Sequence, residues 1–124
     1  MKNKNIFESI KCAISGIILA FKAEKNLTLY VIIALIFLVL NIVLKSSMLE
    51  ICIFIILTFV VFATEHINTA IERVVDKFIM KKDENAKYIK DVAAGAVLIC
   101  GIAFFLVEGL ILIPKIIKWG IIWF

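Results

Sequence analysis

The chain has 124 residues, of which 64% are hydrophobic, and its formal net charge is +4. A soluble fold of this length could not bury so much apolar surface, so the composition predicts one small membrane domain over residues 1–124. The sequence has no basic stripe with interleaved aromatic residues, which argues against a nucleic-acid partner. Its three cysteines lack Cys-x-x-Cys spacing and indicate neither a zinc site nor a disulfide framework.

The first predicted element is an amphipathic helix over residues 6–24. Apolar residues such as Phe7 and Ile10 recur near helical spacing, while Glu8 and Lys11 fall between them. Charge interrupts this segment too often for it to cross a bilayer. We therefore expect it to lie on the membrane surface, with its lysines near anionic head groups.

Three apolar segments follow, and each approaches the roughly 17 to 25 residues that a spanning helix needs. The predicted spans cover residues 27–44, 49–71 and 92–113. The second is expected to continue as a helix to about residue 79, and a charged loop is expected over residues 80–87. Asp91 or a neighbour is expected to cap the third span, and Pro114 is expected to end it.

The distribution of lysine and arginine predicts the orientation. Five precede the first span, one lies between the first two spans, six lie between Arg73 and Lys90, and two follow the third span. Positive charge is enriched on the cytoplasmic side of membrane proteins. The N-terminus and the second loop are therefore expected in the cytoplasm.

A polar stripe ends the second span. Its members, each three or four residues from another member, are Glu65, Asn68, Thr69, Glu72 and Asp76. At about 100° per residue they share one helix face. Carboxylates gathered at a membrane edge repel one another unless a cation joins them, and Mg²⁺ is commonly bound by one or two carboxylates plus nucleotide phosphates. The alternative is a solvated helix end paired with Arg73 and Lys77.

Two longer motifs contain or follow this stripe. One is Glu-x-x-Asn-Thr-Ala-Ile-Glu-x-x-Val-Asp over residues 65–76, and the other is Lys-Asp-Val-Ala-Ala-Gly-Ala-Val-Leu over residues 90–98. Together they resemble the small prokaryotic membrane lipid kinases, the diacylglycerol kinase and undecaprenol kinase family. Glu24 matches a further acidic position of that family, and the resemblance covers nearly the whole chain.

The resemblance implies an all-α integral membrane kinase that uses ATP and Mg²⁺ to phosphorylate a lipid alcohol at the bacterial cytoplasmic (inner) membrane. It also implies a homotrimer with active sites shared between neighbouring subunits. Glu65 would be the general base toward the lipid hydroxyl, and Asn68 would line the catalytic site. Glu24 and Glu72 would hold the metals that bridge the phosphates.

The resemblance further implies that Asp76, Lys90 and Asp91 line the nucleotide site. No glycine-rich phosphate-binding loop of the common kinds occurs in the sequence, so any such site has to be built from helix faces. His66 lies about 100° from Glu65 and is expected to be a packing residue. Glu108, an acid inside the third span, is expected either to pair with a neighbouring subunit or to lie near the outer interface.

The acceptor alcohol stays open between undecaprenol and diacylglycerol, although the form Asn-Thr-Ala-Ile-Glu-Arg-Val-Val-Asp looks closer to the undecaprenol kinase branch. A small ion or proton-coupled transporter is the alternative from another class, because acids in membranes often carry ions. Transport sites are expected near the bilayer midplane, whereas the stripe lies at the membrane edge. The position of the stripe therefore favours a kinase.

Overall fold

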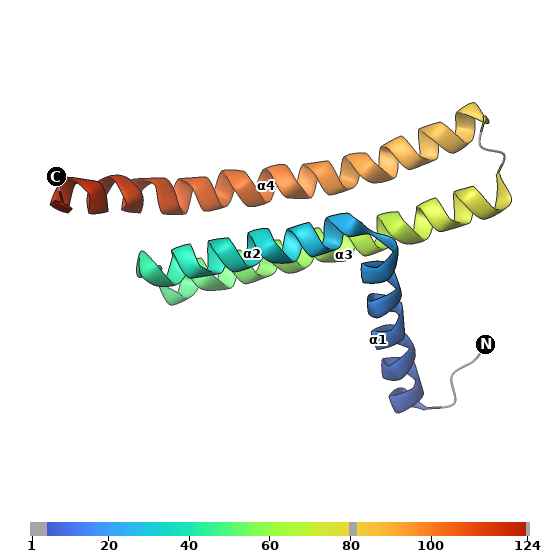
Figure 1. Ribbon diagram of the computed structural model, residues 1–124, viewed down its shortest axis with the longest axis horizontal. Helices are drawn as coiled ribbons and strands as arrows, with labels where there is room; N and C mark the ends of the chain where they lie inside the picture. Colours follow the sequence, from blue (N-terminus) through green and yellow to red (C-terminus); the bar gives the residue numbers. More distant parts are fainter. Residues whose placement is uncertain (1–4, 80–81, 124) are drawn as a thin grey trace.

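The computed structural model describes residues 5–79 and 82–123, with side chains described as far as residue 122. These residues form four helices: α1 (Ile6–Ala23), α2 (Lys25–Val43), α3 (Met48–Phe78) and α4 (Glu84–Trp123). Figure 1 shows α2, α3 and α4 running side by side, while α1 projects crosswise from them. Within the described residues, α2, α3 and α4 are long and apolar enough to cross a membrane.

A single residue separates α1 from α2. Asn5 caps the start of α1 by accepting a hydrogen bond from the Glu8 amide at 2.9 Å. Glu24 has an extended backbone, with φ −119° and ψ 113°, and its amide donates back to the Ala20 carbonyl. The chain therefore turns sharply at Glu24, and Ala20 is the only described side chain of α1 that is buried. That α1 lies on a membrane surface stays a prediction.

A short turn makes α2 and α3 antiparallel. Lys45 adopts the left-handed conformation with φ 54°, which is uncommon for a residue other than glycine. Ser47 then begins α3 with a capping box. Its hydroxyl accepts from the Glu50 amide at 3.2 Å, and the Glu50 carboxylate accepts from the Ser47 amide at 2.7 Å. Two otherwise unpaired amides are satisfied in this way, which fixes the start of α3.

The third span was expected to begin at residue 92, after a loop. This was wrong for the helix that contains it, because α4 begins at Glu84. Asp83, and not Asp91, satisfies the first amides, accepting from Asn85 at 2.7 Å and from Ala86 at 3.3 Å. Asp91 instead lies inside α4, where it pairs with Lys87 one turn earlier at 2.7 Å. Much of the expected charged loop is therefore helical, while its residues 80 and 81 lie outside the described residues.

The expectation that Pro114 ends this helix was also wrong, because α4 continues through it to Trp123. Proline removes one helical hydrogen bond, but a long apolar helix of a membrane protein tolerates this loss through local adjustment. Beyond the proline, Lys115 pairs with Glu50 at the start of α3 at 2.6 Å. This ion pair ties the continued helix to the bundle.

Asn41 of α2 and Glu108 of α4 are fully buried and face each other between the helices. The Asn41 amide nitrogen (Nδ2) donates to Glu108 Oε2 at 2.8 Å and to the Phe37 carbonyl at 3.0 Å. We call the Asn41–Glu108 pair the polar latch. Glu108 thus has its partner within the same chain, which corrects the expected pairing with a neighbouring subunit. This hydrogen bond offsets part of the cost of burying the two polar side chains, while Asn41 Oδ1 and Glu108 Oε1 are buried without a hydrogen-bond partner among the described residues.

Candidate active site

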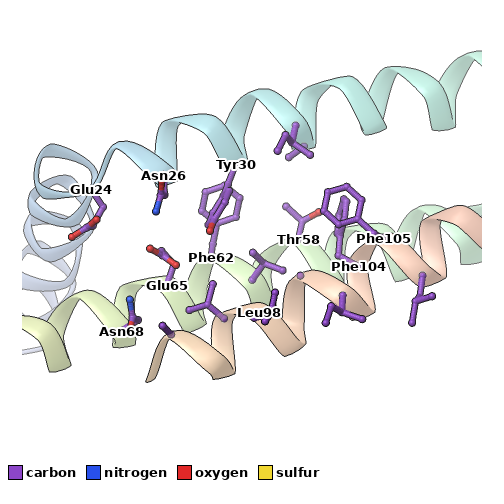
Figure 2. Close-up of a pocket in the computed structure, with 18 of the residues that line it drawn as sticks. Glu24, Asn26, Tyr30, Thr58, Phe62, Glu65, Asn68, Leu98, Phe104 and Phe105 are labelled. Atoms are coloured by element: carbon purple, nitrogen blue, oxygen red, sulfur yellow. The ribbon is translucent and has the colours of Figure 1, made fainter. Parts of the chain in front are cut away.

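A cavity of about 710 Å³ lies among α2, α3 and α4, and one of its ends is polar. Figure 2 shows Glu24 and Asn26 on one side of this end and Glu65 and Asn68 on the other. Glu72 lines it as well. The remaining walls are mainly apolar and extend along all three helices. We call this cavity the groove.

Helix packing brings Glu24 level with the acids of α3. Tyr30 of α2 meets Phe62 of α3 edge to face, with ring centroids 6.5 Å apart. Phe21, near the end of α1, stacks on the same Phe62 ring at 6.2 Å. Glu65 follows Phe62 by about one helical turn. The three aromatic rings therefore hold α1, α2 and α3 together at the level where the acids enter the groove.

Glu65 is the most buried acid of the stripe, with 3% of its surface exposed. Among the described residues, no hydrogen bond or ion pair to its carboxylate is found. The carboxylates of Glu24 and Glu72 both act on it electrostatically. Like charges gathered at a buried position repel one another unless a cation joins them or one of them takes up a proton. This end of the groove is therefore suited to cation binding and to proton transfer.

A second cavity, of about 550 Å³, lies beside the connection between α3 and α4, and we call it the loop pocket. Lys90 donates to Asp76 at 2.6 Å and so ties α4 to α3, while Lys87 and Asp91 form their own pair along the wall. Lys90 precedes the apolar part of α4. Its pKa is raised, mainly because its ammonium donates a hydrogen bond to Asp76. Glu72 lines the groove and Asp76, one turn further along α3, lines the loop pocket, so the two cavities adjoin.

The structure divides the predicted site residues between these two cavities. The residues that line the groove include Glu24, Glu65, Asn68 and Glu72. The residues that line the loop pocket include Asp76, Lys90 and Asp91. His66 lines neither cavity; its ring meets Phe21 edge-on at 5.9 Å, and its Nδ1 lies 2.7 Å from the Phe62 carbonyl. His66 thus packs between α1 and α3.

The family model described as prokaryotic diacylglycerol kinase matches residues 11–112. The chain belongs to this family. It is 30% identical over 115 residues to a diacylglycerol kinase of Synechocystis, covering 92% of this chain and 66% of that protein. It is 33% identical over 110 residues to the undecaprenol kinase of Bacillus subtilis, covering 89% of each chain. No solved structure is significantly similar to the chain.

The family membership confirms the resemblance that the two motifs carry, and the family is one of lipid kinases. The chain spans slightly less than two thirds of the length of the Synechocystis relative. The two relatives carry the names of two different acceptor lipids. The names of the relatives therefore do not decide between the two acceptors for this chain.

Asn68 bears on whether the groove fits the Mg²⁺ that the resemblance implies. Its side chain is 7% exposed, its Nδ2 donates to Glu72 at 3.5 Å, and its Oδ1 is buried without a hydrogen-bond partner among the described residues. Within the described part of the chain, no three His, Cys, Asp or Glu side chains could hold a metal ion by themselves. Mg²⁺ commonly takes one or two protein carboxylates and completes its shell with phosphates and water. The acids of the groove and the amide oxygen fit this pattern.

Sequence reasoning missed two residues of the polar end, Asn26 and Tyr30. They lie four residues apart, so they share one face of α2, and Asn26 follows Glu24 by two residues. This spacing places them beside an acid that the sequence had already singled out. The spacing could therefore have indicated Asn26 and Tyr30 as site residues. It could do so only once the face of α2 that packs against α3 was known.

Proposed function

We propose that this protein transfers the γ-phosphate of ATP to the hydroxyl of a membrane lipid alcohol, with undecaprenol as the preferred acceptor and diacylglycerol as the alternative. The observation that carries the proposal is the position of Glu65. It is an almost fully buried carboxylate at the junction between the acidic end of the groove and its apolar walls. A lipid in the bilayer can present its hydroxyl there while the nucleotide approaches from the loop pocket.

In this proposal, Glu65 takes the proton of the lipid hydroxyl as its oxygen forms a bond to the γ-phosphorus. The bond between that phosphorus and the bridging oxygen of ADP breaks, and ADP leaves with the electron pair. Phosphoryl transfer depends mainly on positioning and on stabilisation of the phosphate charge. A bound Mg²⁺ would supply charge neutralisation, and Glu24 and Glu72, with the oxygen of Asn68, would hold it.

The nucleotide would lie between the groove and the loop pocket. Lys90 is the cation at this boundary, where it interacts with Glu72 and with Asp76. Opening of the Lys90–Asp76 pair would free the ammonium for a phosphate oxygen. Asp91 would then face the rest of the nucleotide from α4. An exposed ion pair contributes little stability, so exchanging one partner for phosphate costs little.

We further infer that the protein is a homotrimer in the cytoplasmic membrane of a bacterium. The N-terminus and the α3–α4 connection would lie in the cytoplasm, and α1 would lie along the membrane surface. The lysine and arginine distribution supports the orientation. The crosswise direction of α1 relative to the other helices supports its surface position. This arrangement exposes the acidic end of the groove to ATP.

The direct experiment gives the purified protein in micelles labelled ATP and Mg²⁺, with undecaprenol or dioleoylglycerol as the lipid. We expect labelled undecaprenyl phosphate, with a smaller yield of labelled phosphatidic acid. A transporter would instead move ions across vesicles and label neither lipid. A folded preparation that labels neither lipid would overturn the proposed function.

A further inference from the structure

The polar latch leaves two of its oxygen atoms without a hydrogen bond. The Asn41 amide nitrogen uses both of its hydrogens, one toward Glu108 Oε2 at 2.8 Å and the other toward the Phe37 carbonyl at 3.0 Å. Asn41 Oδ1 and Glu108 Oε1 are buried, and neither has a hydrogen-bond partner among the described residues. An ionised carboxylate has only acceptor atoms, so an ionised Glu108 could not satisfy Asn41 Oδ1. The pair therefore lacks one donor.

The neighbours of Glu108 along α4 are apolar. Phe104 and Leu112, one helical turn before and after it, are 5% and 3% exposed. Phe104 also meets Phe37, which lies one turn before Asn41 on α2, with ring centroids 5.1 Å apart. A carboxylate in such surroundings loses its hydration without replacement, and a charge inside a membrane is costly. The surroundings therefore favour a neutral carboxyl group.

The nearby charges favour the neutral form as well. In the part of the chain that the structure describes, no cation forms an ion pair with Glu108. Lys115, about 10 Å further along the axis of α4, pairs with Glu50 of α3 at 2.6 Å. Glu50 is also the charged group found to act electrostatically on Glu108, and its charge is negative. The partner from α2, Asn41, carries no charge. A negative charge on Glu108 would thus be repelled and would have no counter-charge of its own.

One proton would satisfy both unpaired atoms. The side-chain amide of asparagine is planar and carries one donor atom and one acceptor atom on the same carbon, and a protonated carboxyl group has the same arrangement. Two such groups can face each other through two parallel hydrogen bonds. In the latch, the bond from Asn41 Nδ2 to Glu108 Oε2 would be the first of them. The second would run from a proton on Oε1 to Oδ1, the two atoms that lack partners.

We propose that Glu108 binds a proton on Oε1 and donates it to Asn41 Oδ1, so that the polar latch is a neutral acid–amide pair joining α2 to α4 by two hydrogen bonds. This proton is a structural ligand, separate from any proton that Glu65 takes up in the groove. The site goes beyond the proposed kinase function and does not depend on it, since neither Asn41 nor Glu108 lines the groove or the loop pocket.

Water and a monovalent cation are the other ligands that could satisfy the unpaired atoms. Either could also contact Ser46, whose hydroxyl is buried without a partner among the described residues and whose amide donates to the Asn41 carbonyl at 2.9 Å. Both ligands leave Glu108 ionised. Only the proton removes the buried charge and satisfies both atoms of the pair together, which is why the observations favour it.

Infrared spectroscopy of the whole chain in lipid vesicles tests the protonation directly, because the carbonyl stretching band of a protonated carboxyl group is separate from the bands of carboxylates. Glu108→Gln is the main variant, since a carboxamide can make the same two hydrogen bonds without a titratable group. At neutral pH we expect a protonated-carboxyl band in the wild type that is missing from Glu108→Gln. Glu84→Gln, at an exposed acid of α4, is the matched control and should keep the band.

Stability provides a second measurement. Loss of one hydrogen bond lowers the ratio of folded to unfolded protein about fivefold, so Glu108→Gln, which keeps both bonds, should change this ratio by less than about twofold. Titration of the micellar protein with SDS measures the ratio. The double variant Asn41→Leu with Glu108→Leu removes the whole pair and should also lack the infrared band. It keeps the test decisive even if Glu108→Gln fails to fold.

The outcomes separate the three ligands. Loss of the band in Glu108→Gln or in the double variant, with the band kept in Glu84→Gln, supports the bound proton. An unchanged carboxyl region in both latch variants would overturn it, because Glu108 would then be ionised. Replacement of Na⁺ by choline should leave the wild type unaffected, and a fall in its stability would indicate a cation site instead. A fivefold or greater loss of stability in Glu108→Gln would also contradict a neutral pair.

Discussion

Glu65 differs from the other acids of the stripe in its burial. It is 3% exposed, whereas Asp76 lies at the surface and pairs with Lys90. The two acids share a helix face but have different surroundings, since one adjoins hydrocarbon and the other adjoins a charged connection. Exclusion of water favours proton acceptance by a carboxylate, because it disfavours the charged form, whereas a carboxylate that contacts a polar ligand needs no such site.

Glu65→Gln keeps the volume of the side chain and removes its capacity to accept a proton. A general base typically contributes about 10² to 10⁴ in rate, so we expect kcat to fall by that factor while the affinity for ATP changes little. Turnover and nucleotide binding, measured on the same preparation, check this. Glu84→Gln, at an exposed acid outside both cavities, is the control. A variant that loses ATP affinity as far as turnover would assign Glu65 to the nucleotide instead.

Glu24 and Glu72 are expected to act together on the metal. Replacing either by Gln removes a negative ligand at nearly constant volume, so activity should be lost or should require a much higher Mg²⁺ concentration. Titration of activity with Mg²⁺ measures this, and a thermal unfolding curve shows whether the fold is retained. Normal rates with an unchanged Mg²⁺ dependence in both variants would contradict the assignment.

At the scale of elements, the apolar runs predicted three helices long enough to span, and the structure contains them. The start of α4 was missed because its first residues are strongly charged and were interpreted as a loop. The Lys87–Asp91 pair, one turn apart, instead stabilises the helix. The polar latch was also missed, although Asn41 is the one strongly polar residue of its span and Glu108 is an acid inside another. Nothing within either segment defines the register that brings the two together.

The latch gives a prediction about stability. Asn41→Leu leaves the buried Glu108 carboxyl without its amide partner, which should destabilise the fold by about 1–3 kcal/mol. The double variant Asn41→Leu with Glu108→Leu removes both polar groups and should recover most of this loss. Thermal unfolding in micelles measures both. If the double variant were as unstable as Asn41→Leu alone, the hydrogen bond would not be the origin of the effect.

At the scale of the whole molecule, the site depends on how α1, α2, α3 and α4 are assembled. The sequence predicted the acids of the stripe as one face, and the family resemblance added Glu24. The division into a groove and a loop pocket could not be predicted, because it arises from the packing of α4 against α3. The ion pair between Lys90 and Asp76 illustrates this, since neither residue indicates its partner in the sequence.

The orientation of the molecule can be tested by labelling. In membrane vesicles of known sidedness, Lys82→Cys should react only from the cytoplasmic side and Lys45→Cys, at an exposed position of the α2–α3 turn, only from the opposite side. The excess of lysine and arginine around the α3–α4 connection is the physical basis for this expectation. The native cysteines are replaced beforehand so that only the introduced thiol reacts. Labelling of Lys82→Cys from the outer side alone would reverse the topology and remove the acids from the ATP compartment.

The central claim is that the acids of the groove catalyse phosphorylation of a membrane lipid alcohol, with undecaprenol preferred. The most direct measurement places undecaprenol and dioleoylglycerol together, in equal amounts, in vesicles that contain the purified protein, and follows labelled phosphate from Mg-ATP into each lipid. The account predicts that label enters undecaprenol in preference, and that Glu65→Gln loses this transfer. Absence of label in both lipids, with the protein folded and ATP bound, would contradict the account.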